Sequence, residues 1–141
     1  MTFSIAPNIT ADTVLSLITA YLPNDGEYSV STTAWTKAII AMKEEILKEQ
    51  WDRLFNDFQI GLGVRGYSGE VSSWLLDLYA RRSEGGPISH RLGSRCWLTM
   101  GSRFQTELQD RNETKVPLDI LALIKTVAEK MAPLLTVAVE D

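Results

Sequence analysis

The sequence predicts an all-α protein, with about five helices packed as a compact helical bundle in a single domain over residues 1–141 and no significant sheet. Three observations lead to this prediction. Apolar residues recur three and four positions apart along most of the chain. Short clusters of Gly, Pro, Asn and Asp separate these periodic segments. A length of 141 residues with 45% apolar residues suits one hydrophobic core without disulfides.

The N-terminal half is expected to hold two helices. Thr10 is a good N-cap for the first helix, which Pro23 ends. Ser31 and the threonines after it can cap a second, long helix that continues to about Phe58. Apolar positions of this segment fall on two lines roughly 140° apart around the axis. The long helix therefore packs on two sides, or it kinks within residues 43–48.

The C-terminal half is expected to hold three more helices. The third follows Ser68 and ends at the Gly-Gly-Pro break of residues 85–87. The fourth runs over about 89–108, with an apolar residue at every fourth position. The last occupies about 117–135 and starts with a proline, whose missing N–H costs nothing at the first helical position. This segment is the most apolar of the chain, and its expected buried face is Leu118, Leu121, Ile124, Ala128, Met131 and Leu135.

Composition excludes several classes of protein. A formal charge of -4 argues against a general nucleic-acid coat, which is normally basic. Cys96 is the single cysteine, so an internal disulfide framework and a Cys-cluster zinc site are both ruled out. The first cation is Lys37, unlike the basic start of a signal peptide, and no stretch is apolar enough to span a bilayer. We expect a cytoplasmic protein without a membrane anchor and without a cofactor.

Two short patterns resemble catalytic motifs. Residues 61–66 match the string GxGxxG, but a dinucleotide site needs these glycines between a strand and a helix of a βαβ unit. Here they follow a long predicted helix, which favours a flexible connector. His90 and Cys96 are unique residues that could form one Cys–His pair. On a helix they would lie about 240° apart, so we interpret Cys96 as core and His90 as surface.

Two pairs of carboxylates lie one helical turn apart and could together hold Mg²⁺: Glu49 with Asp52, and Glu107 with Asp110. This arrangement resembles that of the all-α MazG-like nucleotide pyrophosphohydrolases. The resemblance implies a Mg-dependent nucleotide hydrolase, but the family pairs an ExxE with an ExxD, and no ExxE occurs here. Basic residues also alternate with these acids, as on an ordinary solvated helix face.

A basic cluster lies between residues 81 and 103 of this net-negative chain: Arg81, Arg82, His90, Arg91, Arg95 and Arg103. Apart from the histidine, each cation in this window is arginine, whose planar fork suits phosphate and carboxylate groups. The cluster is therefore a candidate site for an anion, a nucleic acid or an acidic partner. The alternative is a basic end of the bundle that pairs with the acidic long helix.

The leading functional hypothesis is a non-enzymatic interaction or assembly module that self-associates or binds a protein partner through apolar helix faces. It depends on an excess of apolar positions, four of them tryptophan, over what a small helical domain can bury. The first alternative is an anion- or nucleic-acid-binding module that uses the arginine cluster. The second is the Mg-dependent hydrolase.

Overall fold

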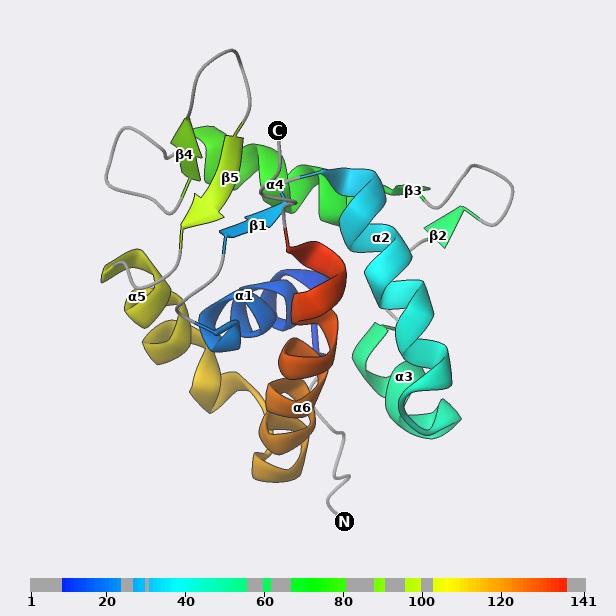
Figure 1. Ribbon diagram of the computed structural model, residues 1–141. Helices are drawn as coiled ribbons and strands as arrows, with labels where there is room; N and C mark the ends of the chain where they lie inside the picture. The colour runs from blue at the N-terminus through cyan, green and yellow to red at the C-terminus, as the bar shows by residue number, and fades with distance from the viewer. Residues whose placement is uncertain are drawn as a thin grey trace.

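The computed structural model describes residues 9–23, 27–29, 31–55, 60–61, 67–80, 88–90, 96–99 and 103–136. Helices dominate this part of the chain, which confirms the α-helical class (Figure 1). The described α-helices are α1 (Ala11–Tyr21), α2 (Thr32–Ala41), α3 (Lys48–Phe55), α4 (Gly69–Ala80), α5 (Arg103–Asn112) and α6 (Leu118–Leu135). Two 3₁₀ turns, η1 (Met42–Glu44) and η3 (Glu113–Lys115), follow α2 and α5.

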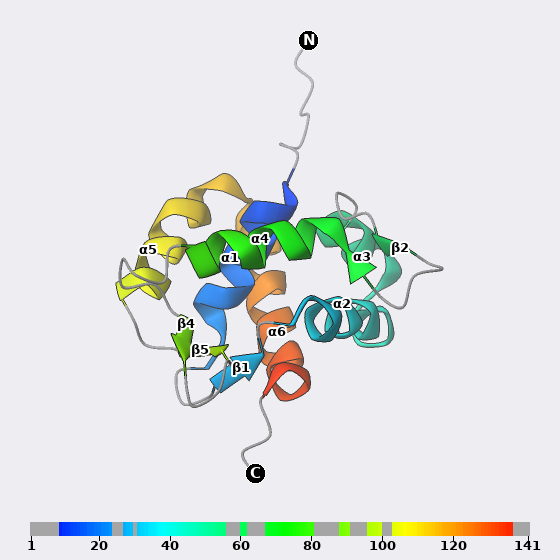
Figure 2. The same cartoon turned by 90° about the horizontal axis from the view of Figure 1, so that it is seen from above.

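Helix α1 lies at the centre of the packing and contacts α3, α4, α5 and α6. Viewed from above, α4 crosses over α1, while α5 and the α2–α3 pair flank it on opposite sides (Figure 2). The helix starts as predicted, since the Thr13 backbone N–H donates to the Thr10 side-chain oxygen at 3.2 Å. Residues 13–20 of α1 are all buried. A helix that is buried on every side is a core helix, and α1 therefore organises the fold.

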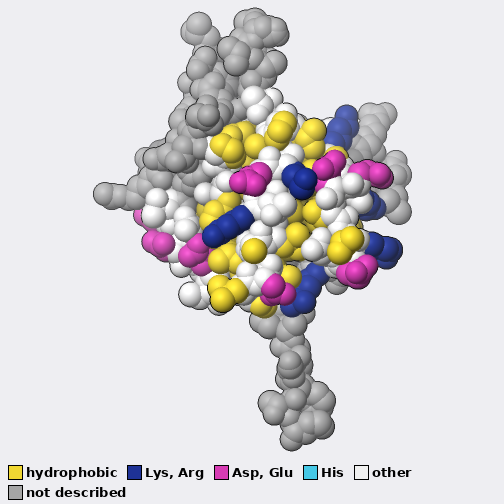
Figure 3. Space-filling view, turned by 60° about the horizontal axis from the view of Figure 1, so that its bottom comes forward, with side chains coloured by type: hydrophobic (Ala, Val, Ile, Leu, Met, Phe, Trp, Pro, Cys, Tyr) yellow, Lys and Arg dark blue, Asp and Glu magenta, His cyan; other side chains and the backbone are white. Residues whose placement is uncertain are grey.

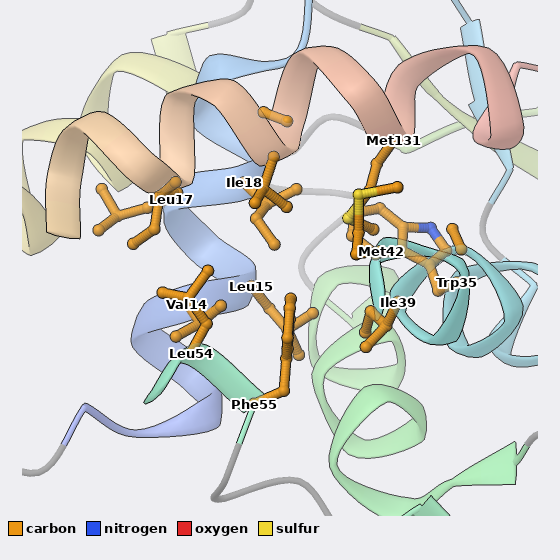
Figure 4. Packing of buried hydrophobic residues seen from close by; sticks show 14 of the residues in the cluster. Val14, Leu15, Leu17, Ile18, Trp35, Ile39, Met42, Leu54, Phe55 and Met131 are labelled. Carbon is orange, nitrogen blue, oxygen red and sulfur yellow. The ribbon is translucent and has the colours of Figure 1, made fainter. Parts of the chain in front are cut away.

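One hydrophobic cluster joins α1 to its neighbours. Figure 4 shows how the side chains of α1 meet those of α2, α3 and α6. The labelled members are Val14, Leu15, Leu17, Ile18, Trp35, Ile39, Met42, Leu54, Phe55 and Met131. Trp35 also packs on Trp74 of α4, with ring centroids 5.6 Å apart. Both indole rings are buried, so they serve as core anchors of the kind expected for tryptophan in a helical domain.

The single long helix expected up to Phe58 is wrong, and its alternative, a kink within 43–48, is confirmed. Helix α2 ends at Ala41, η1 follows, and α3 begins at Lys48. A straight helix would present its two apolar lines to different sides of the molecule. The turn instead lets apolar residues from both lines of the predicted helix enter one core. Met42 belongs to one line and Leu54 to the other, and both are buried in the same cluster.

Two short antiparallel sheets accompany the helices. Strands β1 (Glu27–Ser29), β5 (Cys96–Thr99) and β4 (Ile88–His90) pair in that order, and β2 (Ile60–Gly61) pairs with β3 (Tyr67–Ser68). The helix expected over 89–108 is therefore wrong in its first half, and α5 starts at Arg103. The four-residue apolar repeat winds around a straight helix by about 40° per step, so it provides no constant face for packing. The strands are too short to change the helical class.

Helix α6 confirms the predicted C-terminal helix and its place in the core. It begins at Leu118, with Pro117 at the N-cap position, one residue later than expected. Ile124, Val127, Ala128, Met131 and Leu135 are fully buried. Leu118 corrects the predicted face, because it is 83% exposed. The buried face of α6 runs through Ile120 instead. Leu118, the first residue of the helix, therefore points toward solvent.

Candidate functional site

Among the described residues, two depressions lie along the seam between α2 and α6, and together we call them the α2/α6 groove. These helices are in contact and run in opposite directions (Figure 1). Each depression has α6 on one side and the α2–η1–α3 segment on the other. We call the depression between α6 and the η1–α3 segment the acidic end of the α2/α6 groove, and the depression between α6 and α2 the small-residue end.

The acidic end has a volume of about 620 Å³. Ile46, Leu47 and Leu123 supply its apolar lining, and Leu47 is 62% exposed. Three carboxylates and one cation also line it: Glu44, Glu45, Asp119 and Lys130. This end therefore offers apolar side chains beside an excess of negative charge.

The turn between α2 and α3 fixes the position of Leu47. Its backbone N–H donates to Gln50 Oε1 at 3.0 Å, and its carbonyl accepts from the Trp51 N–H at 2.9 Å. The first of these bonds is half of a capping box, in which the third residue of a helix reaches back to the N-cap. Trp51 Nε1 in turn donates to the Ile39 carbonyl at 2.8 Å and ties α3 to α2. Leu47 is thus an exposed leucine on a fixed backbone.

The small-residue end has a volume of about 530 Å³. Alanines at 34, 38 and 41 line it on the α2 side, together with Ser31, Thr33 and Lys37. From α6 it receives Leu134, which is 51% exposed. Alanine side chains leave room above α2, so this end can accept a larger apolar side chain.

An ion pair connects the two sides of the groove, with Lys130 Nζ 3.5 Å from Glu45 Oε1. The two side chains are 39% and 49% exposed, so water screens the pair and its contribution to stability is small. Its effect on the surface is clearer. It neutralises one of the acids at the acidic end and leaves Glu44 and Asp119 without an ion-pair partner among the described residues.

The molecule also presents a face on which charged and apolar side chains are mixed (Figure 3). Among the described side chains in Figure 3, cations and anions are interspersed with hydrophobic groups rather than gathered by sign. Two further exposed leucines lie outside the groove, Leu76 on α4 at 66% and Leu118 at 83%. Single exposed leucines are ordinary on protein surfaces. Leu47 and Leu134 each border one of the two depressions of the groove.

A polar cluster connects α1 to α5, η3 and α6 away from the groove. Tyr21 Oη donates to Glu113 Oε2 at 2.5 Å, and Gln109 Nε2 donates to the same oxygen at 2.8 Å. These hydrogen bonds lower the pKa of Glu113 below its ordinary value. Burial, followed by the bond to Glu113, raises the pKa of Tyr21 above its usual range. Lys125 Nζ lies 5.2 Å from the Tyr21 ring centroid. Each side chain of this cluster contacts another one, so the cluster links α1 to α5, η3 and α6.

The structure does not bring the two carboxylate pairs together. Glu49 and Asp52 lie on α3, Glu107 and Asp110 lie on α5, and these helices occupy opposite sides of the molecule (Figures 1 and 2). Asp52 pairs with Lys48 at 3.0 Å and Glu107 with Arg111 at 3.9 Å. No group of His, Cys, Asp and Glu that could hold a metal ion occurs within the described ranges. The shared Mg²⁺ site of the hydrolase hypothesis is therefore not formed by these residues.

The arginine cluster falls largely outside the described residues. Arg81, Arg82, Arg91 and Arg95 lie there, and for His90 and Arg103 the structure describes the backbone alone. His90 ends β4 and Arg103 begins α5. The cluster thus remains a prediction from the sequence.

The prediction that His90 and Cys96 lie on different sides of a helix is wrong, because both residues lie in strands. The two residues are register partners in the β4–β5 pair, so they are neighbours across an antiparallel ladder rather than on two sides of a helix. For the GxGxxG string, Gly61 ends β2, while Gly63 and Gly66 lie outside the described ranges. Strands β2 and β3 pair antiparallel, unlike the parallel strands of a βαβ unit.

Comparison of this chain with family models, with curated proteins and with solved structures finds no match in any of the three. Within the part of the chain that the structure describes, no helix combines the length and the apolar character that crossing a membrane requires. The groove was not identified from the sequence. Leu47 and Leu134 are apolar residues within two of the predicted helices, but their exposure depends on how α2, α3 and α6 pack.

Proposed function

We propose that this protein is a non-enzymatic interaction module that binds a protein surface through the α2/α6 groove. The observation that carries the proposal is the pairing of two exposed leucines with two depressions along one seam. Protein interfaces place large apolar side chains in pockets on the partner and surround them with polar groups. The groove has both features before any partner binds.

The chemistry of the groove defines what it can bind. Its acidic end combines Ile46, Leu47 and Leu123 with the carboxylates of Glu44 and Asp119. A complementary surface therefore carries a protruding apolar side chain together with a lysine or arginine. A helical surface fits this description, because ridges of side chains on helices pack between the ridges of a facing pair of helices. Nucleic acid is disfavoured at this site, since its phosphates would face carboxylates.

Site-specific photocrosslinking tests the proposal. A benzophenone side chain is introduced at Leu47 or Leu134, and at Leu76 as a matched control that is equally exposed but outside the groove. We expect the two groove positions to form crosslinks to protein in the native host, and the control to form none above background. The charge substitution Glu44→Lys should reduce the crosslinks made from Leu47. Equal crosslinking from all three positions would overturn the proposal.

A further inference from the structure

We propose that the surface bound by the α2/α6 groove is the same groove of a second copy of this chain, packed in the reverse direction. This inference depends on the proposed function and specifies its partner. It is carried by the two ends of the groove, which are complementary to each other in shape and in charge.

The shape of the groove is self-complementary. Each end has an exposed leucine and a depression: Leu47 at the acidic end, and Leu134 at the small-residue end. On α6, Leu123 and Leu134 are separated by about 16 Å along the helix axis, at about 1.5 Å per residue. The two ends are therefore far enough apart to receive separate side chains. A reversed second copy presents each leucine to the opposite end.

A two-fold axis across the groove satisfies this geometry. If the axis lies in the plane of contact and perpendicular to the groove, it reverses the groove but sets α2 against α2 and α6 against α6. Leu134 of one copy then faces the acidic end beside Leu123 of the other. Leu47 faces the alanines of the opposite α2 that are partly exposed, Ala34 and Ala41. In such an isologous interface each contact occurs twice, so both leucines of both copies are covered.

Charge selects this orientation over its alternative. The same axis sets Lys37 of one copy against Glu44 of the other, and neither residue forms an ion pair with another described residue. A two-fold axis along the groove would instead bring the two acidic ends together, with Glu44 and Glu45 near Asp119 of the second copy. Like charges in that position repel, whereas the reversed arrangement pairs opposite ones.

The first experiment measures the mass of the full chain by size exclusion with light scattering over a series of concentrations. We expect a dimer that dissociates on dilution. Leu47→Glu and Leu134→Glu should each raise the dimer dissociation constant by about tenfold or more, because each places a charge in an apolar contact twice per dimer. Leu76→Glu adds the same charge on α4 and should leave the constant unchanged. A wild-type chain that stays monomeric at about 1 mM would overturn the inference.

The second experiment tests the orientation by exchanging charges. Lys37→Glu and Glu44→Lys should each weaken the dimer by roughly threefold to tenfold. The double variant restores opposite charges across the axis and should return to near the wild-type constant. Both positions are exposed, so thermal melts should show an unchanged fold. A double variant weaker than either single variant would overturn the reversed packing.

The outcomes separate this inference from the proposed function. A monomeric protein whose groove positions still crosslink to another protein overturns self-association and supports the interaction module. A dimer that Leu47→Glu and Leu134→Glu leave intact overturns the groove as its interface. Failure of both the crosslinks and the dimer overturns the proposed function itself.

Discussion

Tyr21 and Glu113 stand 92 positions apart in the sequence, and their side chains share a hydrogen bond of 2.5 Å. The bond joins the last residue of α1 to the first residue of η3, so it connects the central helix to the segment between α5 and α6. An O–H donor and an ionised acceptor give a short, strong bond. Gln109 and Lys125 add a second donor and a nearby positive charge, and both stabilise the ionised form of Glu113.

We expect Tyr21→Phe to lower the free energy of unfolding by about 1 kcal/mol at neutral pH, less than a buried charged hydrogen bond gives, because Glu113 is partly exposed. The loss should shrink in acid. Because the pKa of Glu113 is lowered in the folded state, the hydrogen bond contributes fully to stability above the ordinary glutamate pKa of 4.5. This stabilisation is lost as the pH falls through the lowered pKa.

Urea denaturation of the wild type, Tyr21→Phe, Glu113→Gln and the double variant, at pH 7 and near pH 3, measures this coupling. A double-mutant cycle should give a coupling energy at pH 7 that is smaller near pH 3. A coupling energy that does not change with pH would mean that the charge of Glu113 is not involved.

Thr36 is fully buried on α2, and its Oγ1 has no hydrogen-bond partner among the described residues. Valine has nearly the same shape and removes the unsatisfied oxygen. We therefore expect Thr36→Val to stabilise the protein by about 1 kcal/mol, measured as a higher Tm. Thr13→Val is the matched control, because the buried Thr13 accepts a hydrogen bond from Thr10 Oγ1 at 3.1 Å. That substitution should lower Tm, and a lower Tm for both variants would contradict the prediction.

Local signals in the sequence predicted the helices with distinct ends. Thr10 supplies the hydroxyl that caps α1, and Pro117 fixes the start of α6 within one residue. Both depend on chemistry within one helical turn, which a sequence shows directly. Strand β5 gives no comparable signal, since it pairs with β1 about 70 positions earlier in the chain and its four residues carry no clear alternation. Only its second partner, β4, lies nearby in the sequence, so the pairing with β1 depends on the folded chain.

The groove was beyond sequence reasoning for a related reason. Leu118 and Ile124 are both apolar and lie on one predicted helix, yet the first is exposed and the second is buried. Their difference arises from which side of α6 faces the core, the side of Ile120 and Ile124, which periodicity alone did not locate. Leu47 gains its exposure from the turn between α2 and α3, whose position the sequence restricted only to the range 43–48. The apolar excess could be predicted, but its place on the surface could not.

Trp51 holds the turn that presents Leu47. Trp51→Phe removes the 2.8 Å hydrogen bond to the Ile39 carbonyl while keeping an aromatic ring against Phe55. We expect a loss of about 1 kcal/mol in the free energy of unfolding and weaker self-association, because α3 is no longer tied to α2. Lys43→Ala is the control, since it removes the contact of Lys43 Nζ with the same ring, 4.6 Å from its centroid, and keeps the hydrogen bond of Trp51. If Trp51→Phe has the same dimer dissociation constant as the wild type, the turn does not need this hydrogen bond.

Helix α6 is a structural element of the core, and the groove uses only its outer side. Ile124 is fully buried on the inner side, whereas Thr126, two positions later, is exposed. Ile124→Asp places a carboxylate in the apolar cluster and removes a side chain whose burial contributes about 1.5–3 kcal/mol. Together these effects approach the usual stability of about 5–15 kcal/mol for a domain, so we expect loss of the cooperative thermal transition.

Thr126→Asp is the matched control and should melt like the wild type when both are measured as monomers, because Thr126 is exposed at the acidic end of the groove and lies outside the core. Truncation after Asn112 should have the same effect as Ile124→Asp, since it removes five fully buried side chains of α6: Ile124, Val127, Ala128, Met131 and Leu135. Near-UV circular dichroism and dye binding would then report a loosely packed chain. The rival interpretation makes α6 a detachable element that docks onto a partner. A truncated chain with a sharp melt and intact near-UV signal would establish that rival, and would move the interface from the outer side of α6 to its inner side.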